Sequence, residues 1–350
     1  MKAGIVGLPN VGKSTLFNCL SNSKAQSANF PFCTIEPNIG VVNVPDNRLL
    51  NLESLVNPEK VIPATVEIVD IAGLVKGASK GEGLGNQFLG NIRETDAIIH
   101  VLRCFDDDNI IHVDGSVDPV RDKEIIDLEL QLKDLETITK KLEKTVRTAK
   151  TGNKEAQKEL IILNQIKSHL ESFKSVRSIE FDKESYLAFV TPLQLITDKP
   201  VLYVCNVDEN SATTGNHYVD TVKKLVSTEN AEVITLAVGI EADINELDDF
   251  EERKIFLDDL GLSEPGSSKL LRSTYKLLNL QTYFTAGVKE VRAWTIPVGS
   301  TAPQAAGVIH TDFEKGFIRA EVISYDNYVT YKNELKVKEA GKMNIEGKNY

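Results

Sequence analysis

The stretch Gly7-Leu8-Pro9-Asn10-Val11-Gly12-Lys13-Ser14 decides the fold class of this chain. It has the spacing GxxxxGK[ST], and it lies between a strand-like apolar run at 2–7 and a helix-like run that begins at Thr15. In that context the glycines let backbone N–H groups surround phosphate oxygens. Lys13 then reaches the β- and γ-phosphates, and Ser14 offers its hydroxyl to Mg²⁺. The stretch therefore predicts a nucleotide-binding P-loop.

Short apolar runs alternate with helix-like stretches around this motif. Nearly continuous apolar strands are typical of a parallel sheet that is covered on both faces, and strands that alternate with helices indicate a doubly wound α/β domain. The expected strands are 2–7, 39–44, 65–70, 97–103, 200–205 and 232–237.

A different pattern fills residues 121–175. Apolar residues recur there at spacings of three and four, and turn residues at 151–154 interrupt them. This predicts an antiparallel helical hairpin whose two apolar seams bury each other. The seam residues are Leu128, Leu132, Leu135, Ile138, Leu142, Val146, Leu160, Leu163, Ile166, Leu170 and Phe173.

Three regions follow from these patterns. We expect a discontinuous P-loop G domain at 1–120 and 196–277, with the hairpin inserted at 121–195. From about residue 278 an alternating strand pattern at 288–296 and another at 317–323 predict a small α+β domain, 278–350.

Charge and composition exclude several classes of protein. The net charge of −11 argues against a generally basic nucleic-acid binder. No apolar run approaches the roughly 20 residues of a membrane span, and no secretory signal opens the chain. The four cysteines form no CxxC pair, so we expect reduced thiols and a cytoplasmic protein.

The expected hairpin tip, 140–158, is an exception to the acidic composition. It carries seven lysines and arginines against Glu143 and Glu155. Two interpretations remain open: an ordinary solvated helix face, or a contact with a polyanion such as RNA.

Asp70-Ile71-Ala72-Gly73 has the DxxG form expected beside a P-loop. There Asp70 would hold Mg²⁺ through water, and the Gly73 N–H would sense the γ-phosphate. Thr34 is either a switch threonine that completes the Mg²⁺ shell or a surface loop residue. The glycine-rich stretch at 73–85 favours a second switch loop. Leu74 stands where related enzymes carry a glutamine that orients the attacking water, so another polar group must act or hydrolysis stays slow.

The sequence Asn206-Val207-Asp208-Glu209 follows the strand expected at 200–205. Guanine-specific relatives carry Asn-Lys-x-Asp at this point. Here the lysine is missing and the acid is Glu209, one methylene longer. Because a buried carboxylate left without a partner is costly, the altered geometry should weaken selectivity for guanine.

Together with the P-loop, three stretches resemble the YchF family of Obg-like ATPases. They are 29–38, Asn-Phe-Pro-Phe-Cys-Thr-Ile-Glu-Pro-Asn; 70–75, Asp-Ile-Ala-Gly-Leu-Val; and 279–287, Asn-Leu-Gln-Thr-Tyr-Phe-Thr-Ala-Gly. The degenerate box at 206–209 adds to the resemblance, which covers essentially the whole chain. It implies an ATP-preferring G domain, an inserted coiled-coil hairpin, a C-terminal TGS domain of β-grasp type, and association with ribosomes.

The resemblance also implies roles for individual residues. Phosphates are bound by Asn10, Val11, Gly12, Lys13, Ser14 and Thr15, with Gly73. Mg²⁺ is held by Ser14, Thr34 and Asp70. The base is met by Asn206, Val207 and Glu209, with Val207 contacting adenine through its backbone.

Catalysis is assigned to His112 together with Lys13. In the family a histidine replaces the missing glutamine, and His112 is the matching position, whereas the residue by itself reads as an ordinary loop histidine. Asn10 resembles the asparagine that holds K⁺ in potassium-dependent relatives, and loop capping is its alternative role.

Two further expectations concern the end of the chain and a cysteine. YchF proteins continue with another β-strand after the segment that matches 346–350, so the sequence predicts a C-terminally truncated TGS domain. Cys33 neighbours Thr34, and its oxidation is a hypothesis for control of the switch, against a simple packed thiol.

The sequence thus predicts a ribosome-associated ATPase that uses Mg²⁺ and works as a switch-like regulator in translation or stress response. Its RNA contacts are expected through the hairpin tip and the TGS domain. The alternatives are an Obg-type GTPase of ribosome biogenesis, or a nucleotide-gated scaffold whose hydrolysis is vestigial.

Overall fold

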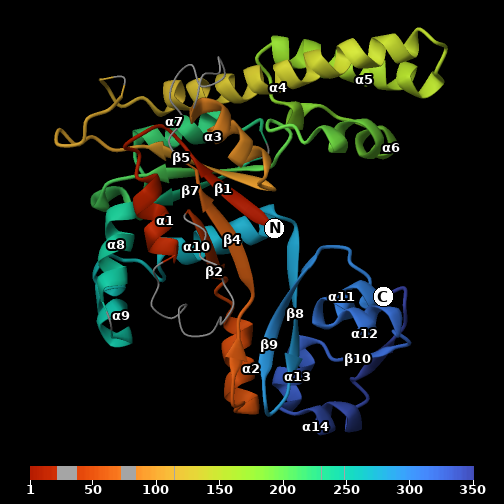
Figure 1. Ribbon diagram of the computed structural model, residues 1–350. Coiled ribbons are helices and arrows are strands. Elements are labelled where there is room, and N and C mark those ends of the chain that lie inside the picture. The colour runs from red at the N-terminus through yellow and green to blue at the C-terminus, as the bar shows by residue number, and fades with distance from the viewer. Residues whose placement is uncertain (22–37, 72–83, 114, 230, 248) are drawn as a thin grey trace. The chain divides into compact units, whose positions relative to one another are not determined.

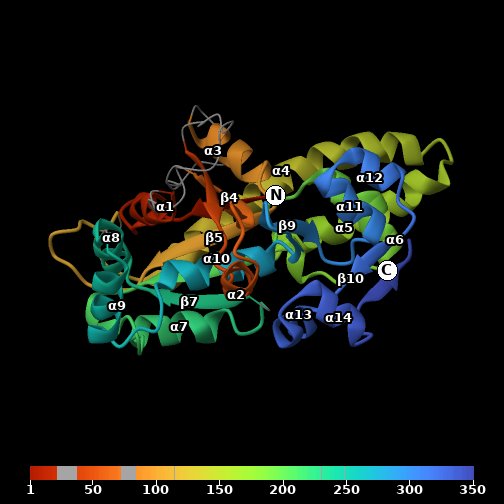
Figure 2. The same ribbon diagram turned by 90° about the horizontal axis from the view of Figure 1, so that it is seen from below.

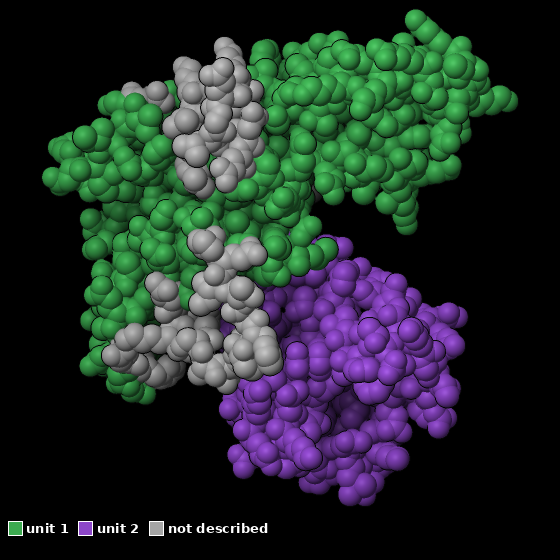
Figure 3. Space-filling view, viewed as in Figure 1, with its two compact units in different colours: residues 1–40, 67–270 green, residues 41–66, 271–350 purple. Residues whose placement is uncertain are grey.

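The structure is a computed structural model (Figure 1), and it divides into two compact units (Figure 3). It describes residues 1–21, 38–71, 84–113, 115–229, 231–247 and 249–350. The first unit comprises residues 1–40 and 67–270, and the second comprises residues 41–66 and 271–350.

A six-stranded sheet in the order β2-β4-β1-β5-β6-β7 forms the core of the first unit, and only residues 41–43 of β2 and 65–66 of β4 are assigned to the second. Neighbouring strands from β4 to β7 run parallel. All six expected strands are confirmed to within one residue at each end. Their bounds are β1 (Lys2–Val6), β2 (Ile39–Asn43), β4 (Thr65–Asp70), β5 (Ala97–Arg103), β6 (Val201–Asn206) and β7 (Glu232–Leu236).

The central strands β5 and β6 are buried at every residue. Helices lie on both sides of the sheet (Figure 1), which explains why these strands are apolar throughout rather than alternating. The predicted α/β architecture is therefore confirmed. The helices of this unit outside the hairpin include α1 (Lys13–Ser21), α3 (Leu84–Arg93), α7 (His217–Leu225), α8 (Val238–Glu246) and α9 (Phe250–Asp259), with the short η5 (Glu209–Ser211). Helix α10 (Gly266–Leu277) spans the boundary at residue 270 between the two units.

The helical hairpin is confirmed as α4 (Pro119–Ala149) and α5 (Lys154–Glu171), which lie side by side in Figures 1 and 2. Each helix begins at a side-chain cap. Asp118 accepts hydrogen bonds from the N–H groups of Val120 and Arg121, and Asn153 accepts one from Ala156. The turn residues of the sequence thus mark the point where the chain reverses.

The apolar seam of the hairpin differs from the expected one at both ends. Leu128 is exposed, because this part of α4 packs through Ile126 and Leu130 on the sheet side. Phe173 is also exposed, in a left-handed conformation just past α5. Between them, Ile138 and Leu163 pack with a returning segment that the periodicity did not predict: η2 (Val176–Ser178), α6 (Lys183–Ser185), η3 (Tyr186–Val190) and η4 (Thr191–Leu193).

The second unit contains two small sheets. In the first, β8 and β9 pair antiparallel, and β3 adds parallel to β9; in the second, β10 pairs antiparallel with β11. The run expected at 288–296 becomes a strand only from Val291, because 287–290 form the turn. The run expected at 317–323 is shorter, 320–322. The elements are α2 (Asn47–Val56), β3 (Val61–Ile62), β8 (Leu280–Ala286), β9 (Val291–Pro297), α11 (Ala302–Ile309), α12 (Thr311–Lys315), β10 (Ala320–Val322), α13 (Tyr325–Tyr331), α14 (Glu334–Glu339) and β11 (Asn344–Glu346).

Within the described ranges, the longest helices are too polar to cross a membrane, and none meets both the length and the apolarity that a span requires.

Candidate active site

The P-loop connects β1 to α1, at the carboxyl end of a central strand. Asn10 and Gly12 adopt positive φ angles of 63° and 97°. A side chain at Gly12 would place its Cβ 2.5 Å from Asn206 Nδ2, so only glycine fits there. Helix α1 begins at Lys13, and its free N–H groups therefore close the loop from one side. This geometry is that of an anion-binding cradle.

Lys13 is buried inside this cradle. Its Nζ donates a 2.6 Å hydrogen bond to the Leu8 carbonyl, and its side chain folds back over the loop. Burial lowers the pKa of Lys13 to about 8, and the nearby Asp70 carboxylate opposes that shift only in part. A phosphate group would supply the negative charge that this lysine needs.

Ser14 and Asp70 form the part of the site that suits a cation. Ser14, on the first turn of α1, donates a 3.1 Å hydrogen bond through its Oγ to Oδ2 of Asp70, the last residue of β4. Asp70 Oδ1 is buried and has no hydrogen-bond partner among the described residues. A hydroxyl and a carboxylate with an open lone pair are oxygen ligands of the kind that Mg²⁺ takes, so the residues present fit this ion.

Apart from Asp70, the residues outside the P-loop that are predicted to bind phosphate or Mg²⁺ are either exposed or outside the described residues. Thr15 is exposed on the first turn of α1. Thr34, Gly73 and Leu74 lie outside the described residues, as do Cys33 and most of the glycine-rich stretch. Nothing about their roles is therefore added by the structure.

Asn206 holds the P-loop from behind. It is buried, its Nδ2 donates to the Val11 carbonyl at 3.0 Å, and its Oδ1 accepts from the Val238 N–H at 3.0 Å. One amide side chain thus links the P-loop to the start of α8. The structure places Asn206 at the site as a brace within the protein.

The next three residues include Val207 and Glu209, the other two residues that the sequence predicts to contact the base. Val207 is buried, and its N–H donates to the Leu236 carbonyl. Asp208 caps the short helix η5, accepting from Ser211 N–H and Oγ at 3.2 and 2.9 Å. Glu209 is exposed on that helix. No described contact holds the Glu209 carboxylate in a fixed direction.

A second loop, 104–113, follows β5 and lies beside the P-loop. Arg103 is buried and donates to three of its carbonyls, those of Phe105, Asp107 and Ile110. Asn10 Nδ2 of the P-loop donates to the Ile111 carbonyl at 3.2 Å. The structure thus brings His112 close to the P-loop in the fold, although the two are about a hundred residues apart in the sequence.

The side chain of His112 points into the protein. It is 7% exposed, and its Nε2 lies 2.8 Å from Asp122 Oδ2 on the first turn of α4. Arg121 Nη2 approaches His112 Nδ1 at 3.5 Å and donates to Asp122 Oδ1 at 3.2 Å. Burial raises the pKa of Asp122, and the His112 and Arg121 partners counteract that shift only in part.

Sequence reasoning missed Arg103, Arg121 and Asp122. One signal was available for Asp122: the Asp118-Pro119 pair marks a helix start and puts Asp122 in the first turn. No sequence pattern indicated that this turn meets the histidine loop. Such contacts between distant segments depend on the assembled sheet.

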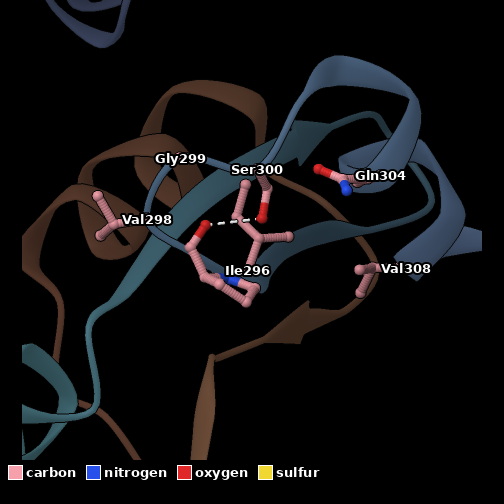
Figure 4. Close-up of a pocket in the computed structure, with 7 residues that line it drawn as sticks. Ile296, Val298, Gly299, Ser300, Gln304 and Val308 are labelled. Carbon is pink, nitrogen blue, oxygen red and sulfur yellow. Dashed lines mark hydrogen bonds between the residues drawn. The ribbon is translucent and has the colours of Figure 1, made fainter. Parts of the chain in front are cut away.

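The second unit also contains a hollow, of about 410 Å³ (Figure 4). It is lined by Ile296, Pro297, Val298, Gly299, Ser300, Gln304 and Val308. Ser300 Oγ donates to the Pro297 carbonyl at 2.7 Å. With no charged side chain in its lining, this hollow lacks the groups that phosphate chemistry requires.

Two family models match the chain. One, described as a 50S ribosome-binding GTPase, matches residues 2–165. The other, YchF-GTPase_C, described as a protein of unknown function (DUF933), matches residues 280–350.

Full-length relatives are similar to the whole chain. The Ribosome-binding ATPase YchF of Escherichia coli O157:H7 is 57% identical over 349 residues, with 100% of this chain and 95% of the relative covered. The Bacillus subtilis protein of the same name is 52% identical over 352 residues, with 100% and 96% covered. The solved structure of the Schizosaccharomyces pombe YchF GTPase is 39% identical, with a TM-score of 0.91 over 100% of this chain and 94% of that one. The chain therefore belongs to the YchF family of P-loop nucleoside triphosphate hydrolases.

Proposed function

We propose that this chain is a ribosome-associated ATPase that binds and hydrolyses ATP with Mg²⁺, prefers ATP to GTP, and acts as a switch in translation or stress response. Relatives over half identical are named ribosome-binding ATPases. The proposed preference for ATP over GTP depends on one observation, the burial and hydrogen bonding of residues 206–209.

A guanine-selective site needs a carboxylate fixed where the guanine N1–H and 2-amino group lie. Here Glu209 is exposed on η5, and the Asp208 carboxylate is already used to cap that helix. Val207, in the position of the usual lysine, is buried and apolar. This arrangement offers guanine no positioned acceptor, and the backbone of Val207 is the proposed contact for adenine.

Mg²⁺ would be held by Ser14 and Asp70, and by Thr34 as the sequence predicts. When bound there, the ion would supply positive charge that stabilises the negative charge of the phosphates during hydrolysis. Lys13 contacts the same phosphates from the P-loop. For K⁺, the side-chain oxygen of Asn10 is the proposed ligand, since its Nδ2 is directed at the Ile111 carbonyl.

His112 is our candidate for the group that orients the attacking water, because Leu74 has no polar atom for this task. The support is positional: the loop that carries His112 is tied to the P-loop through Asn10. A neutral imidazole beside the γ-phosphate can accept a proton of the water and direct its lone pair.

The tip of the hairpin is the proposed contact for ribosomal RNA, together with the C-terminal domain at 278–350. Lys140 and Lys141 pair with Glu136 and Glu159. Five other basic residues are solvent-exposed: Lys144, Arg147, Lys150, Lys154 and Lys158. Positive charges at the end of a long helix pair suit the phosphate backbone of RNA. Association with ribosomes would place the protein in the cytoplasm.

Calorimetric titration with non-hydrolysable ATP and GTP analogues tests this proposal. We expect ATP to bind at least about tenfold more tightly, a difference of about 1.4 kcal/mol. The double variant Val207→Lys/Glu209→Asp should shift selectivity toward GTP, and Glu209→Asp alone serves as the matched control. Tighter binding of GTP by the unmodified chain would instead favour an Obg-type GTPase.

A scaffold whose hydrolysis is vestigial is tested in cells. Lys13→Ala should abolish the cellular function if nucleotide drives a switch. Full function of that variant, at normal protein abundance, would support the scaffold and contradict our proposal.

A further inference from the structure

The loop around His112 has an inverted pattern of burial. Ile111 and Val113 are 79% and 53% exposed, whereas the polar residue between them is 7% exposed. Apolar side chains normally gain free energy by burial, and a histidine that acts on a bound nucleotide must reach the site. The loop therefore exposes the two aliphatic side chains and buries His112, whereas the proposed role in hydrolysis requires His112 to face the nucleotide.

The contacts of His112 account for this inversion. A carboxylate can only accept hydrogen bonds, so the 2.8 Å bond to Asp122 Oδ2 requires the proton on His112 Nε2. Both side chains are nearly inaccessible to solvent, at 4% and 1%. A charge-assisted hydrogen bond of this length in a buried position is strong enough to fix the orientation of the ring.

The helix that carries Asp122 is fixed to the body of the first unit. The adjacent Lys123 is buried and pairs with Asp127 at 2.5 Å and with Glu229 at 2.8 Å. Tyr203 on β6 donates to the same Glu229 at 2.7 Å. The first turn of α4 is therefore the rigid partner, and the histidine loop is the one that can move.

The backbone of that loop is attached up to Ile111. Arg103 binds the Ile110 carbonyl at 2.8 Å, and Asn10 binds the Ile111 carbonyl at 3.2 Å. The second bond comes from the P-loop itself, so phosphate binding at Asn10 acts directly on the residue before His112. A small backbone rotation at 111–113 would turn the imidazole out and the aliphatic side chains in.

We propose that Asp122 is a positioning residue that keeps His112 withdrawn, and that hydrolysis requires the His112–Asp122 pair to separate. This inference rests on the proposed role of His112 in hydrolysis. Asp122 acts through His112 and contacts no substrate atom. The P-loop contact through Asn10 couples separation of the pair to nucleotide.

Steady-state hydrolysis by Asp122→Ala is the first test. Removal of the partner should raise kcat about tenfold or more, the population change expected when a charge-assisted hydrogen bond is lost, with KM for ATP within about twofold. Glu124→Ala is the matched control, because it removes an exposed carboxylate of the same helix and leaves both the cap of α4 and the His112–Asp122 pair in place. We expect its kcat to stay at the level of the unmodified chain.

The outcomes separate this inference from the proposal on which it rests. If His112→Ala keeps its turnover, the proposed role of His112 fails. If His112→Ala loses turnover and Asp122→Ala is unchanged or equally slow, only the inference about Asp122 is contradicted.

A spectroscopic measurement on the unmodified chain covers the case in which Asp122→Ala does not fold. The chain has five histidines, and ¹⁵N-histidine spectra resolve the protonation of each ring nitrogen once His112→Ala identifies the His112 signals. Without nucleotide we expect a hydrogen-bonded Nε2–H on His112. Addition of Mg²⁺, ADP and aluminium fluoride should remove that signal, and its persistence in the trapped state would overturn the proposal.

Discussion

Two loops follow neighbouring strands of the same sheet, and they differ in what fixes them. The P-loop after β1 is fixed by its own backbone, by glycine at position 12 and by the buried Asn206. The loop after β5 is held by side chains from other elements. Arg103 binds three of its carbonyls, Asn10 of the P-loop binds a fourth, and His112 contacts α4. The P-loop is thus held in one conformation by its own backbone, and the position of His112 depends on contacts with other elements.

This difference matches the two tasks. A cradle of backbone N–H groups works best when it is preorganised, since nothing then has to move when phosphate arrives. A group that starts hydrolysis benefits from being withheld until the nucleotide is in place. Variants in the two loops should therefore differ in their effects on hydrolysis, stability and amide hydrogen exchange.

The largest effect is expected at Lys13. Lys13→Ala removes the only charged P-loop side chain within the cradle, and hydrolysis should fall by about 10²–10³-fold, about 3–4 kcal/mol of lost stabilisation. Lys2→Ala is the control, since Lys2 lies on the preceding strand with its side chain 41% exposed. Turnover of Lys13→Ala within tenfold of the unmodified chain would contradict the proposed role of the P-loop in hydrolysis.

Asn206→Ala tests the rigidity of the P-loop. The change leaves the Val11 carbonyl and the Val238 N–H without their side-chain partner in a buried position, so the free energy of unfolding should drop by about 2–3 kcal/mol. Urea unfolding measures this loss. Asn210→Ala, an exposed change on η5, should cost little by comparison. Equal losses for both would show that Asn206 does not brace the loop.

Arg103→Lys should loosen the second loop selectively. A lysine cannot donate to three carbonyls at once from a planar group, so amide hydrogen exchange at 104–113 should accelerate by about tenfold or more. Exchange of the P-loop amides should stay within about twofold. Equal acceleration in both loops would mean that they are a single rigid body.

The smallest effect concerns His100 on β5, inside the sheet. Burial, with Lys123 and Arg177 nearby, lowers the pKa of His100 to about 3. The unfolded chain protonates this histidine near pH 6.5 and the folded chain does not, so stability falls as pH decreases from 6.5 toward 3, by about 1.4 kcal/mol per pH unit.

Urea unfolding at pH 7.0 and 5.5 checks this expectation. The unmodified chain should lose about 1 kcal/mol more than His100→Phe, which has no group to protonate. Glu229, the facing acidic group, opposes the shift only weakly. Identical pH dependence of the two proteins would contradict the lowered pKa.

Features with a local sequence signal could be predicted, and features that depend on contacts between distant segments could not. The P-loop, the six strands and the hairpin turn were predictable, because glycine spacing, apolar runs and caps are local. Leu128 and Phe173 were wrongly assigned to the hairpin seam, since periodicity does not say which neighbour covers a helix. The returning segment that covers Ile138 has no period of its own.

The residues of the candidate site also divide into those with a local sequence motif and those without one. Ser14 and Asp70 lie within hydrogen-bonding distance, because neighbouring parallel strands end at the same edge of the sheet. His112 was identified only through family resemblance. Its partner Asp122 was missed, because the contact joins a loop to the first turn of a helix and leaves no fixed spacing in the sequence.

Single-turnover hydrolysis of ATP by His112→Ala, with the ATP dissociation constant measured in parallel, tests the central claim most directly. We expect the rate of hydrolysis to fall by about 10²-fold or more while the dissociation constant stays within about twofold, because we assign binding to one loop and catalysis to the other. A rate within threefold of the unmodified chain, with normal binding, would contradict it.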